Sequence, residues 1–394
     1  MKILHTSDWH LGKKLEGIKR IEEQSKFINT LEKIVSNEEP KIILIAGDIF
    51  DTPNPSSEAE TLFFNALKKL SNYGKRAIII IPGNHDSAER LSASKNLARD
   101  FGIIIYEKPF EKKEIGTYGQ FQITYSTEGG IILNIDNEEI FVYSLPYPSE
   151  LALNEEFDDD NISYSKRIGS ILQKGVDEIN NYKQDICKII MTHIFITGSI
   201  GDGDEKAIEL GGARGVFLED LPKVDYIALG HIHKPIKYNS KRAFYSGSPI
   251  EYRVSENKYS KKVFIADIIK NSQLNLKEIE LENYKPIKNY EVNGIEKALE
   301  LSHQLKNIEE WIYLKIHTDK YISSRDIKEI RKNKNILEII PVMKGIEMDS
   351  ISTDIDYGDL DIKESFIEFY KSFDGIEPKE ETLNLFIKIL EEDE

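Results

Sequence analysis

The chain has 394 residues, more than one ordinary hydrophobic core accommodates, so two or three domains are expected. Its composition, 40% hydrophobic and 30% charged, is typical of a soluble globular protein, and no apolar run approaches the ~20 residues that span a bilayer. The net charge of −16 argues only slightly against nucleic-acid binding, because residues 351–394 (4 basic, 14 acidic) carry −10 of it, whereas residues 1–100 (15 basic, 14 acidic) carry +1.

Targeting features are not evident at the start of the chain. Met1-Lys2-Ile3-Leu4 runs directly into a strand-like segment and lacks the charged and apolar regions of a signal peptide. Cys187 is the single cysteine, so an internal disulfide is impossible. We therefore expect a protein of the reducing cytoplasm that does not enter a membrane.

Through about residue 270 the sequence alternates strand and helix signals, which predicts an α/β fold of layered sheets flanked by helices. Short runs of β-branched apolar residues are typical of strands that are buried on both faces. Four such runs follow in chain order: Lys41–Ala46, Arg76–Ile81, Lys188–Met191 and Val224–Leu229.

Between the first two runs the pattern predicts a helix. Ser57 and Glu60 have the spacing of a capping box, and the helical pattern ends before Gly74. The residues at helical spacing, which should form the buried face, are Leu62, Phe63, Ala66, Leu67 and Leu70.

The next segment has a different periodicity. Between Tyr106 and Tyr143 polar and apolar residues alternate and glycines interrupt them, which predicts an antiparallel section or a second sheet. Glu150–Asn161 is strongly acidic and predicts an exposed loop. Gly198–Gly215 contains six glycines and predicts a second surface loop.

A second unit begins near Tyr284. Helical patterns over Gly294–Lys306 and Ser323–Asn333 alternate with strand patterns over Trp311–His317 and Ile336–Val342, which predicts a small α+β domain. The remaining tail is acidic and is expected to form two amphipathic helices. Their aromatic and aliphatic stripes are Phe366, Phe369, Tyr370 and Phe373, and then Leu383, Phe386, Ile387 and Leu390.

Five short motifs follow apolar runs and hold five of the eight histidines. They are Asp8-Trp9-His10, Gly47-Asp48, Gly83-Asn84-His85-Asp86, Thr192-His193 and Gly230-His231-Ile232-His233. Carboxylate, amide and imidazole groups at the ends of buried strands suit two neighbouring divalent metals that activate water against a phosphate ester. Such a pair needs a bridging carboxylate, for which Asp48 is the candidate, and Asn84 offers a neutral oxygen.

Each motif also has a purely structural interpretation, in which its histidine or carboxylate binds no metal. A single D-x-H or H-x-H arises easily by chance, and a lone buried histidine is more often a hydrogen-bonded core residue than a ligand. Five motifs at strand ends favour the metal site. Neither His303 nor His317 has ligand-type neighbours, so we expect both to be structural, and His5 to support the first ligand pair.

The ordered motifs resemble those of the calcineurin-like metallophosphoesterase superfamily. Within it, His5-Thr6-Ser7-Asp8-Trp9-His10-Leu11-Gly12 resembles the SbcD nuclease group, the prokaryotic counterpart of the nucleases that repair double-strand breaks. The superfamily resemblance covers roughly residues 1–270. The second unit resembles the group in layout only, and the tail resembles it least.

The resemblance implies a role for each motif residue. Asp8, His10 and His233 would hold one metal ion, Asn84, His193 and His231 the other, and Asp48 both. The family usually works with Mn²⁺, although these ligand types also admit Fe, Zn or Mg. His85 would contact the scissile phosphate, as proton donor to the leaving oxygen or as a stabiliser of the transition state.

For several residues beside these motifs, two interpretations remain open. Asp86 either orients His85 or caps a loop, and no catalytic role is assigned to Asp51. Trp9 and Leu11 are expected to pack rather than to stack on bases. A basic group either contacts DNA phosphates or forms a solvated loop face; its members are Lys13, Lys14, Lys19 and Arg20.

The resemblance also implies a domain plan and partners. Residues 1–275 would form the nuclease domain, a β-sandwich flanked by helices, and residues 284–345 an α+β domain that caps it and helps present DNA. Residues 350–394 would dock on an SbcC-type coiled-coil ATPase, although the tail could instead fold back on its own chain. A homodimer with contacts from residues 56–105 would complete a heterotetramer.

The implied function is that of a DNA nuclease with 3′→5′ exonuclease and hairpin or single-strand endonuclease activity, in DNA repair, recombination and replication. The alternative is another metallophosphoesterase, a phosphatase or a phosphodiesterase of small molecules. The segment Phe50-Asp51-Thr52-Pro53 lacks the arginine that protein phosphatases of the superfamily carry there. A scaffold with an inactive site is disfavoured by the complete ligand set.

Overall fold

The computed structural model describes residues 1–92, 95–153, 164–199, 215–270 and 272–343, and only isolated positions beyond them. Most of the acidic loop expected at Glu150–Asn161 and of the glycine-rich loop at Gly198–Gly215 therefore lies outside the described residues. The same holds for the two amphipathic helices expected in the tail.

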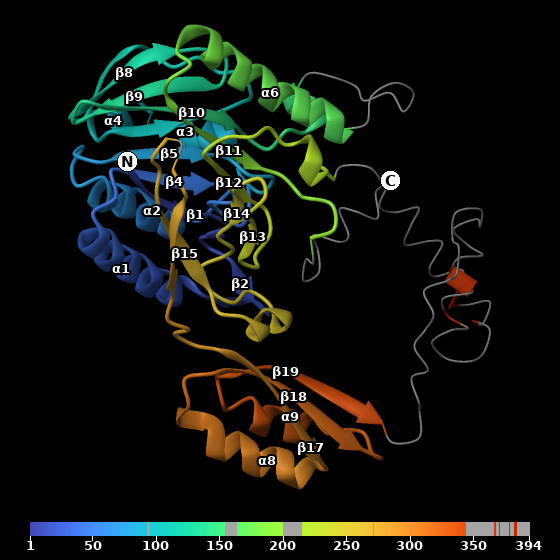
Figure 1. The fold of residues 1–394 in the computed structure, drawn as a ribbon. Helices are drawn as coiled ribbons and strands as arrows, with labels where there is room; N and C mark the ends of the chain where they lie inside the picture. Colours follow the sequence, from blue (N-terminus) through green and yellow to red (C-terminus); the bar gives the residue numbers. More distant parts are fainter. Residues whose placement is uncertain are drawn as a thin grey trace.

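Two mixed sheets packed face to face form the main body (Figure 1). The first sheet has the order β16-β15-β1-β4-β5-β6, with β1 Lys2–Thr6, β4 Ile42–Ala46, β5 Ala77–Ile81, β6 Ile103–Ile105, β15 Lys262–Asp267 and β16 Asn275–Glu280. The second sheet has the order β13-β14-β12-β11-β10-β9-β8-β7. Its strands are β7 Gly116–Tyr118, β8 Phe121–Ser126, β9 Gly130–Ile135, β10 Glu138–Leu145, β11 Cys187–His193, β12 Tyr226–Gly230, β13 Ile236–Tyr238 and β14 Ala243–Tyr245.

Helices cover the outer faces of both sheets, so the expected layering is confirmed. The helices α1 Ile21–Glu38 and α2 Ser57–Leu70 pack on the first sheet, and α6 Tyr164–Tyr182 packs on the second. The shorter elements of this body are α3 Ala88–Ser92, α4 Lys95–Asp100, α5 Glu150–Leu153, the 3₁₀ turns η1 Leu218–Asp220 and η2 Val254–Lys258, and the hairpin β2 Lys14–Leu15 with β3 Ile18–Lys19.

The four predicted strands are confirmed, because each β-branched run is buried on both faces between a helical layer and the opposing sheet. The alternating segment from Tyr106 to Tyr143 is confirmed as antiparallel, with β7 to β10 pairing in sequence. Strands β15 and β16 escaped the sequence pattern. β15 pairs antiparallel with β1, and β16 pairs antiparallel with β15 and forms one edge of the first sheet.

The N-cap of α2 lies one residue before the predicted one. The Ser56 hydroxyl accepts the backbone N–H of Ala59, so Ser56 is the N-cap and the predicted box of Ser57 and Glu60 is wrong. Ser56 has extended backbone angles, which a capping residue requires, whereas Ser57 is already the first helical residue. The predicted face is otherwise buried, except that Leu62 is only partly covered.

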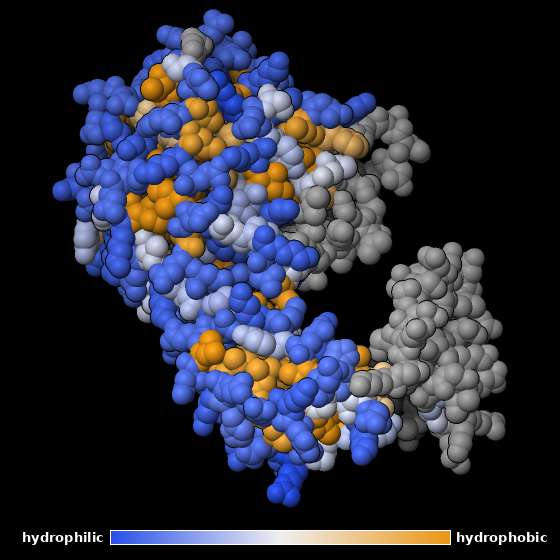
Figure 2. Space-filling model, turned by 60° about the horizontal axis from the view of Figure 1, so that its bottom comes forward, coloured by the Kyte–Doolittle hydropathy of each residue, from blue (hydrophilic) through white to orange (hydrophobic). Residues whose placement is uncertain are grey.

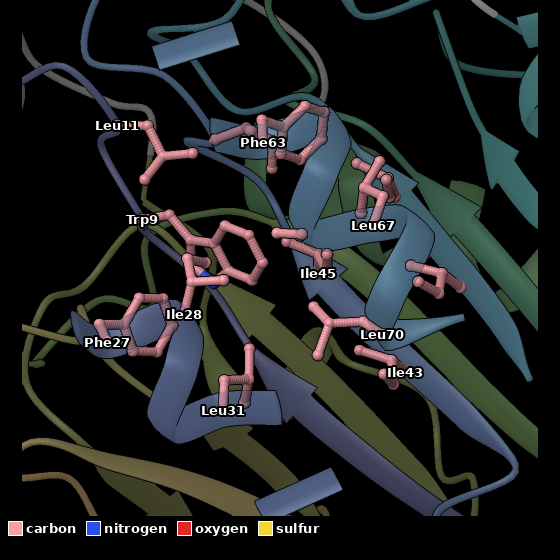
Figure 3. Packing of buried hydrophobic residues seen from close by; sticks show 14 of the residues in the cluster. Trp9, Leu11, Phe27, Ile28, Leu31, Ile43, Ile45, Phe63, Leu67 and Leu70 are labelled. Carbon is pink, nitrogen blue, oxygen red and sulfur yellow. The ribbon is translucent and has the colours of Figure 1, made fainter. Parts of the chain in front are cut away.

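Trp9 lies at the centre of the core beneath α1 and α2 (Figure 3). Its ring meets Phe27 and Phe63 edge to face at centroid distances of 5.4 and 6.2 Å, and its indole N–H donates to Thr6 at 2.9 Å. Leu11 is also buried. The expectation that both residues pack is confirmed, and this packing anchors the loop between them.

Residues 287–343 form a separate lobe (Figure 1), and the face of it seen in Figure 2 carries a band of hydrophobic residues among hydrophilic ones. Its sheet has the order β17-β18-β19, with β17 Ile287–Asn293, β18 Trp311–Thr318 and β19 Ile336–Met343, and the connections contain α8 Ile295–Gln304, η3 Leu305–Asn307 and α9 Ser324–Ile330. All three strands are parallel. This is a βαβαβ arrangement rather than the expected α+β one, because the mostly polar and exposed β17 gave no strand signal.

Trp311 joins this lobe to the main body. Its indole N–H donates to Glu23 of α1 at 2.8 Å, and the ammonium of Lys285 lies 3.4 Å from the ring centroid. Glu23 also pairs with Arg20, whose guanidinium lies 5.9 Å from the same ring. The small apolar cluster at this junction consists of Leu15, Ile287, Trp311, Tyr313 and Leu337.

Candidate metal centre

The candidate site lies where parallel strands of both sheets end. The motifs follow or complete β1, β4 and β5 of the first sheet and β11 and β12 of the second. The loops after β1 and β4 run side by side, because the Asp8 amide donates to the Gly47 carbonyl at 3.0 Å and the His10 amide to the Asp48 carbonyl at 2.9 Å. Strand order therefore brings together motifs that are far apart in the sequence.

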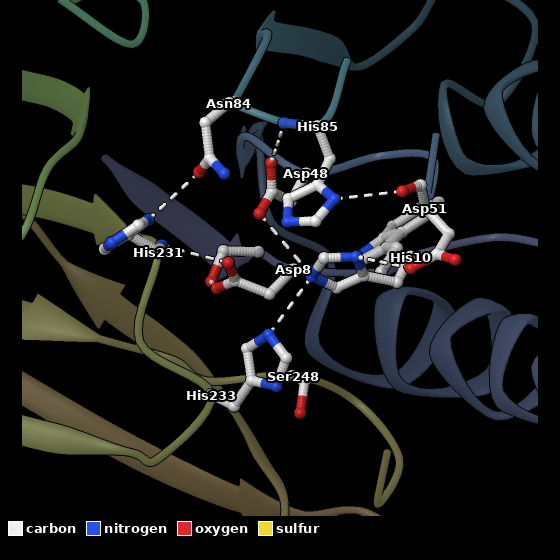
Figure 4. A network of polar contacts seen from close by, with 12 residues as sticks. Asp8, His10, Asp48, Asp51, Asn84, His85, His231, His233 and Ser248 are labelled. Atoms are coloured by element: carbon white, nitrogen blue, oxygen red, sulfur yellow. Dashed lines mark hydrogen bonds and ion pairs between the residues drawn. The ribbon is translucent and has the colours of Figure 1, made fainter. Parts of the chain in front are cut away.

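The first group of side chains surrounds His10 (Figure 4). Its Nε2 lies 3.1 Å from Nε2 of His233 and 3.5 Å from Oδ2 of Asp48. Ligand atoms of Asp8, His10 and His233 all lie within 4.8 Å of one another. Two hydrogen bonds also fix the Asp8 carboxylate. Its Oδ1 accepts a hydrogen bond from the amide of His231 at 2.9 Å, and its Oδ2 accepts one from the hydroxyl of Ser7.

The second group surrounds Asn84. Its Oδ1 lies 3.1 Å from Nε2 of His193 and 3.0 Å from Nδ1 of His231. His193 Nε2 lies 3.4 Å from Oδ2 of Asp48, the oxygen that also faces His10. The structure thus brings all seven predicted ligand residues together, with Asp48 between the two groups.

The hydrogen bonds of the histidines test whether these groups fit metal ions. Nδ1 of His193 donates to the Ala46 carbonyl at 2.9 Å, which leaves Nε2 to face Asp48 and Asn84. Nδ1 of His233 faces Glu256 at 2.9 Å, which leaves its Nε2 as an acceptor toward His10. Acceptor atoms therefore converge in both groups, and a carboxylate, amide and imidazole set of this kind fits divalent cations.

Glycines beside the ligands let the strand ends approach closely. A Cβ on Gly83 would lie 2.1 Å from Oδ1 of Asp48, and one on Gly230 would lie 1.7 Å from the Ala46 carbonyl oxygen. Four predicted ligands also have positive φ angles, a conformation that side chains other than glycine rarely adopt: Asp8, His10, Asp48 and His231. Strained backbone of this kind clusters at functional sites.

Burial and mutual charge set the protonation of the site. Burial raises the pKa of Asp8 to about 6 and lowers that of His10 to about 4 and that of His231 to about 3. Burial alone would also lower the pKa of His193, but the charge and hydrogen bond of Asp48 raise it to about 9. The metal-free site therefore holds a proton on His193 at neutral pH.

Comparisons with known proteins agree with this geometry. The family model described as calcineurin-like phosphoesterase matches residues 1–235, more than half of the chain. The SbcD subunit of the nuclease SbcCD from Bacillus subtilis (strain 168) is 35% identical over 400 residues, which cover 99% of this chain and 97% of that protein. The chain belongs to the SbcD family of calcineurin-like phosphoesterases.

Other relatives of this SbcD-family chain are more distant. The SbcD subunit from Staphylococcus epidermidis is 29% identical over 350 residues, which cover 87% of this chain and 86% of that protein. A solved dimetal phosphatase from Danio rerio covers 71% of this chain and 95% of its own, at 12% identity and a TM-score of 0.39. The family assignment therefore rests on the sequence relatives.

The surroundings of His85 decide between the two interpretations of Asp86. Its Nδ1 donates to the backbone carbonyl of Asp51 at 2.9 Å, and its amide donates to Oδ1 of Asp48 at 3.0 Å. Asp86 instead accepts the backbone N–H groups of Gly83, Ile49 and Phe50 at 2.9 to 3.0 Å. Asp86 therefore caps the loops, and the Asp51 backbone orients His85.

The basic group after the first motif is only partly available to a ligand. Arg20 is 1% exposed and donates to Glu23 and to the Glu251 carbonyl, so the idea that it contacts DNA is wrong. Its positive charge is already paired with Glu23 at the junction with the small lobe. Lys13 pairs with Asp51 at 2.6 Å and Lys19 with Glu58 at 2.8 Å.

Sequence reasoning missed Glu256, which lies fully buried against His233. Burial opposes its ionisation, but Lys261 and His233 hold its pKa well below the usual range. Glu256 belongs to the turn η2, 23 residues beyond His233, and no local motif marks it. His5 is buried on β1, and its Nδ1 lies 3.1 Å from the Tyr226 hydroxyl; its support of the first ligand pair stays a prediction. Among the described helices, none has the length and apolar character that a bilayer crossing requires.

Proposed function

We propose that this protein is a two-metal DNA nuclease acting as the SbcD component of an SbcCD-type complex. The observation that supports this most strongly is the position of Asp48, whose Oδ2 lies 3.5 Å from His10 Nε2 and 3.4 Å from His193 Nε2. A carboxylate between two donor groups can bridge two metal ions, as hydrolysis of a phosphodiester by two metals requires. The relatives named above, which match most of the chain, are nuclease subunits.

The proposed ligand sets follow the two groups. Asp8, His10 and His233 hold one ion, Asp48 is shared, and the second set consists of Asn84, His193 and His231. When bound, the ions activate water and neutralise the phosphate oxygens. Mn²⁺ is the proposed ion because the family resemblance implies it; the donors alone also suit Fe, Zn or Mg.

His85 is the proposed catalytic residue. Since its Nδ1 donates to the Asp51 carbonyl, its Nε2 remains for the substrate. The ring lies edge to face with His10 at a centroid distance of 4.9 Å, beside the proposed metal ligands. With Nδ1 donating to the carbonyl, only the imidazolium form of His85 carries a hydrogen on Nε2 as well, and this form would donate it to the leaving oxygen or to the phosphate in the transition state.

Substrate and partners follow from the same family. We propose 3′→5′ exonuclease and hairpin or single-strand endonuclease activity in the cytoplasm, with the lobe of residues 287–343 capping the nuclease body. The tail, residues 350–394, is proposed to dock on an SbcC-type coiled-coil ATPase. Residues 56–105 are proposed to form the homodimer contact within a heterotetramer.

The test compares DNA with a small phosphate ester. Purified protein, alone and with its ATPase partner, should degrade an end-labelled duplex and open a DNA hairpin in Mn²⁺, and EDTA should abolish both activities. Protein that hydrolyses p-nitrophenyl phosphate esters but leaves DNA intact under all these conditions would be a small-molecule phosphatase or phosphodiesterase, and the nuclease proposal would be wrong.

A further inference from the structure

A buried ion pair lies directly behind His233. Nδ1 of His233 is 2.9 Å from Oε1 of Glu256, whose other oxygen accepts the ammonium of Lys261. Side-chain exposure is 0% for Glu256 and 4% for Lys261, so both charges are removed from water. Burying a pair of charges carries a large desolvation cost, which the pair recovers only with good geometry and further hydrogen bonds.

Both members of the ion pair, Glu256 and Lys261, make such further hydrogen bonds. Lys261 also donates to the Ser248 hydroxyl at 2.7 Å and to the backbone carbonyl of His233 at 3.3 Å. Glu256 Oε2 accepts the amide of Tyr252 at 3.2 Å and the hydroxyl of Ser248 at 3.3 Å. The pair therefore holds His233 at two points, its imidazole ring and its own carbonyl.

The partner of His233 differs from those of His193 and His85, whereas Nδ1 of His10 also faces a carboxylate, Oδ1 of Asp51 at 3.4 Å. His193 and His85 are oriented by backbone carbonyls, those of Ala46 and Asp51. A carboxylate on Nδ1 fixes the same tautomer but also makes the opposite nitrogen a stronger donor toward a cation. This difference is confined to the group that contains His10 and His233.

We infer that Glu256 is a positioning residue of the metal centre, which fixes the His233 ring through Nδ1 and strengthens its Nε2 as a ligand, and that Lys261 keeps Glu256 in place. The inference rests on the proposed function in one respect, the assignment of His233 as a ligand. It goes beyond that assignment because it makes the two metal sites unequal. Loss of Glu256 weakens the site of His10 and His233 and spares the site of Asn84 and His193.

The test is an Mn²⁺ titration followed by the electron paramagnetic resonance signal of the free ion. The wild type should bind two ions, His233→Ala should lose one, and Glu256→Gln should bind that one 10- to 100-fold more weakly while retaining the other. Glu251→Gln is the matched control, because Glu251 is also buried in the same segment but accepts hydrogen bonds from Ile287 and Asn283 instead. It should bind both ions as the wild type does.

A second variant separates positioning from a merely structural ion pair. Glu256→Gln leaves Lys261 without its carboxylate, whereas Glu256→Gln with Lys261→Met removes both charges. The double variant should recover thermal stability in EDTA, but its weakened site should stay 10- to 100-fold weaker than in the wild type. Wild-type affinity at both sites in either variant would overturn the inference while leaving the metal centre intact. A wild type that binds fewer than two ions would overturn the inference and the proposed function together.

Discussion

His10 and His233 are 223 positions apart in the chain, yet their Nε2 atoms lie 3.1 Å apart. Because His233 presents an acceptor there, the contact requires either a hydrogen or a metal ion between the two nitrogens. The contacts of His193 Nε2 with the oxygens of Asp48 and Asn84 also require a hydrogen or a metal ion between the atoms. In the metal-free protein, hydrogens on the histidine nitrogens occupy these positions, and we expect metal ions to replace them.

Metal binding should stabilise the fold. Mn²⁺ at about 100 times its dissociation constant should add about 2.7 kcal/mol to the free energy of unfolding, because only the folded state assembles the ligands. A thermal melt with and without EDTA measures the effect. Asp48→Ala should remove most of the Mn²⁺-dependent increase, and an equal increase in that variant would contradict the shared role of Asp48.

Metal binding should also release a proton at pH 7.5. Since the pKa of His193 is raised to about 9 in the metal-free protein, this residue is protonated below that pH and must lose its proton to bind a cation. Apparent affinity should therefore rise about tenfold per unit between pH 7 and 9. Calorimetry in two buffers with different ionisation enthalpies counts the protons, and release that is no greater at pH 7.5 than at pH 10 would contradict the assignment.

His85→Ala should separate catalysis from metal binding. The variant should cleave DNA about 10²- to 10⁴-fold more slowly, because it lacks the donor to the leaving oxygen, but should bind two Mn²⁺ ions. Asp48→Ala should lose metal as well as activity. Rates and bound metal are measured on the same preparations. DNA cleavage at the wild-type rate by His85→Ala would show that the proposed catalytic role is wrong.

Gly83→Ala should damage the centre without touching a ligand. The added Cβ would lie 2.1 Å from Oδ1 and 2.5 Å from the amide nitrogen of Asp48, so the carboxylate must move. We expect loss of Mn²⁺ binding in the titration. Gly17→Ala is the control: its Cβ meets nothing within 4 Å, so it should cost only about 1–2 kcal/mol of backbone strain at its positive φ and retain both ions.

Trp311→Ala should loosen the small lobe. The ring is buried, and its loss removes the hydrogen bond to Glu23 and the contact with Lys285, so we expect a destabilisation of about 3–5 kcal/mol. Tyr321→Ala, in the same lobe but 92% exposed, should leave the melting temperature unchanged. Equal melting temperatures for Trp311→Ala and the wild type would contradict the role of this junction.

The sequence predicts the candidate site better than its surroundings, for a physical reason. Asp48 and His193 sit at the ends of apolar strands, and parallel strands deliver their ends to one edge, so local patterns identify the site. Glu256 and Arg20 acquire their partners only through tertiary packing, and no spacing marks either. Strand β17 is mostly polar because much of it faces solvent, so its register with β18 also depends on tertiary contacts.

Anomalous diffraction at the manganese edge from crystals grown with Mn²⁺ tests the two-metal centre most directly. We expect two peaks about 3.5–4 Å apart, bridged by the Asp48 carboxylate. One ion should contact Asp8, His10 and His233, and the other Asn84, His193 and His231. A single peak, or two peaks that do not share Asp48, would show that the protein does not hold two metal ions bridged by Asp48.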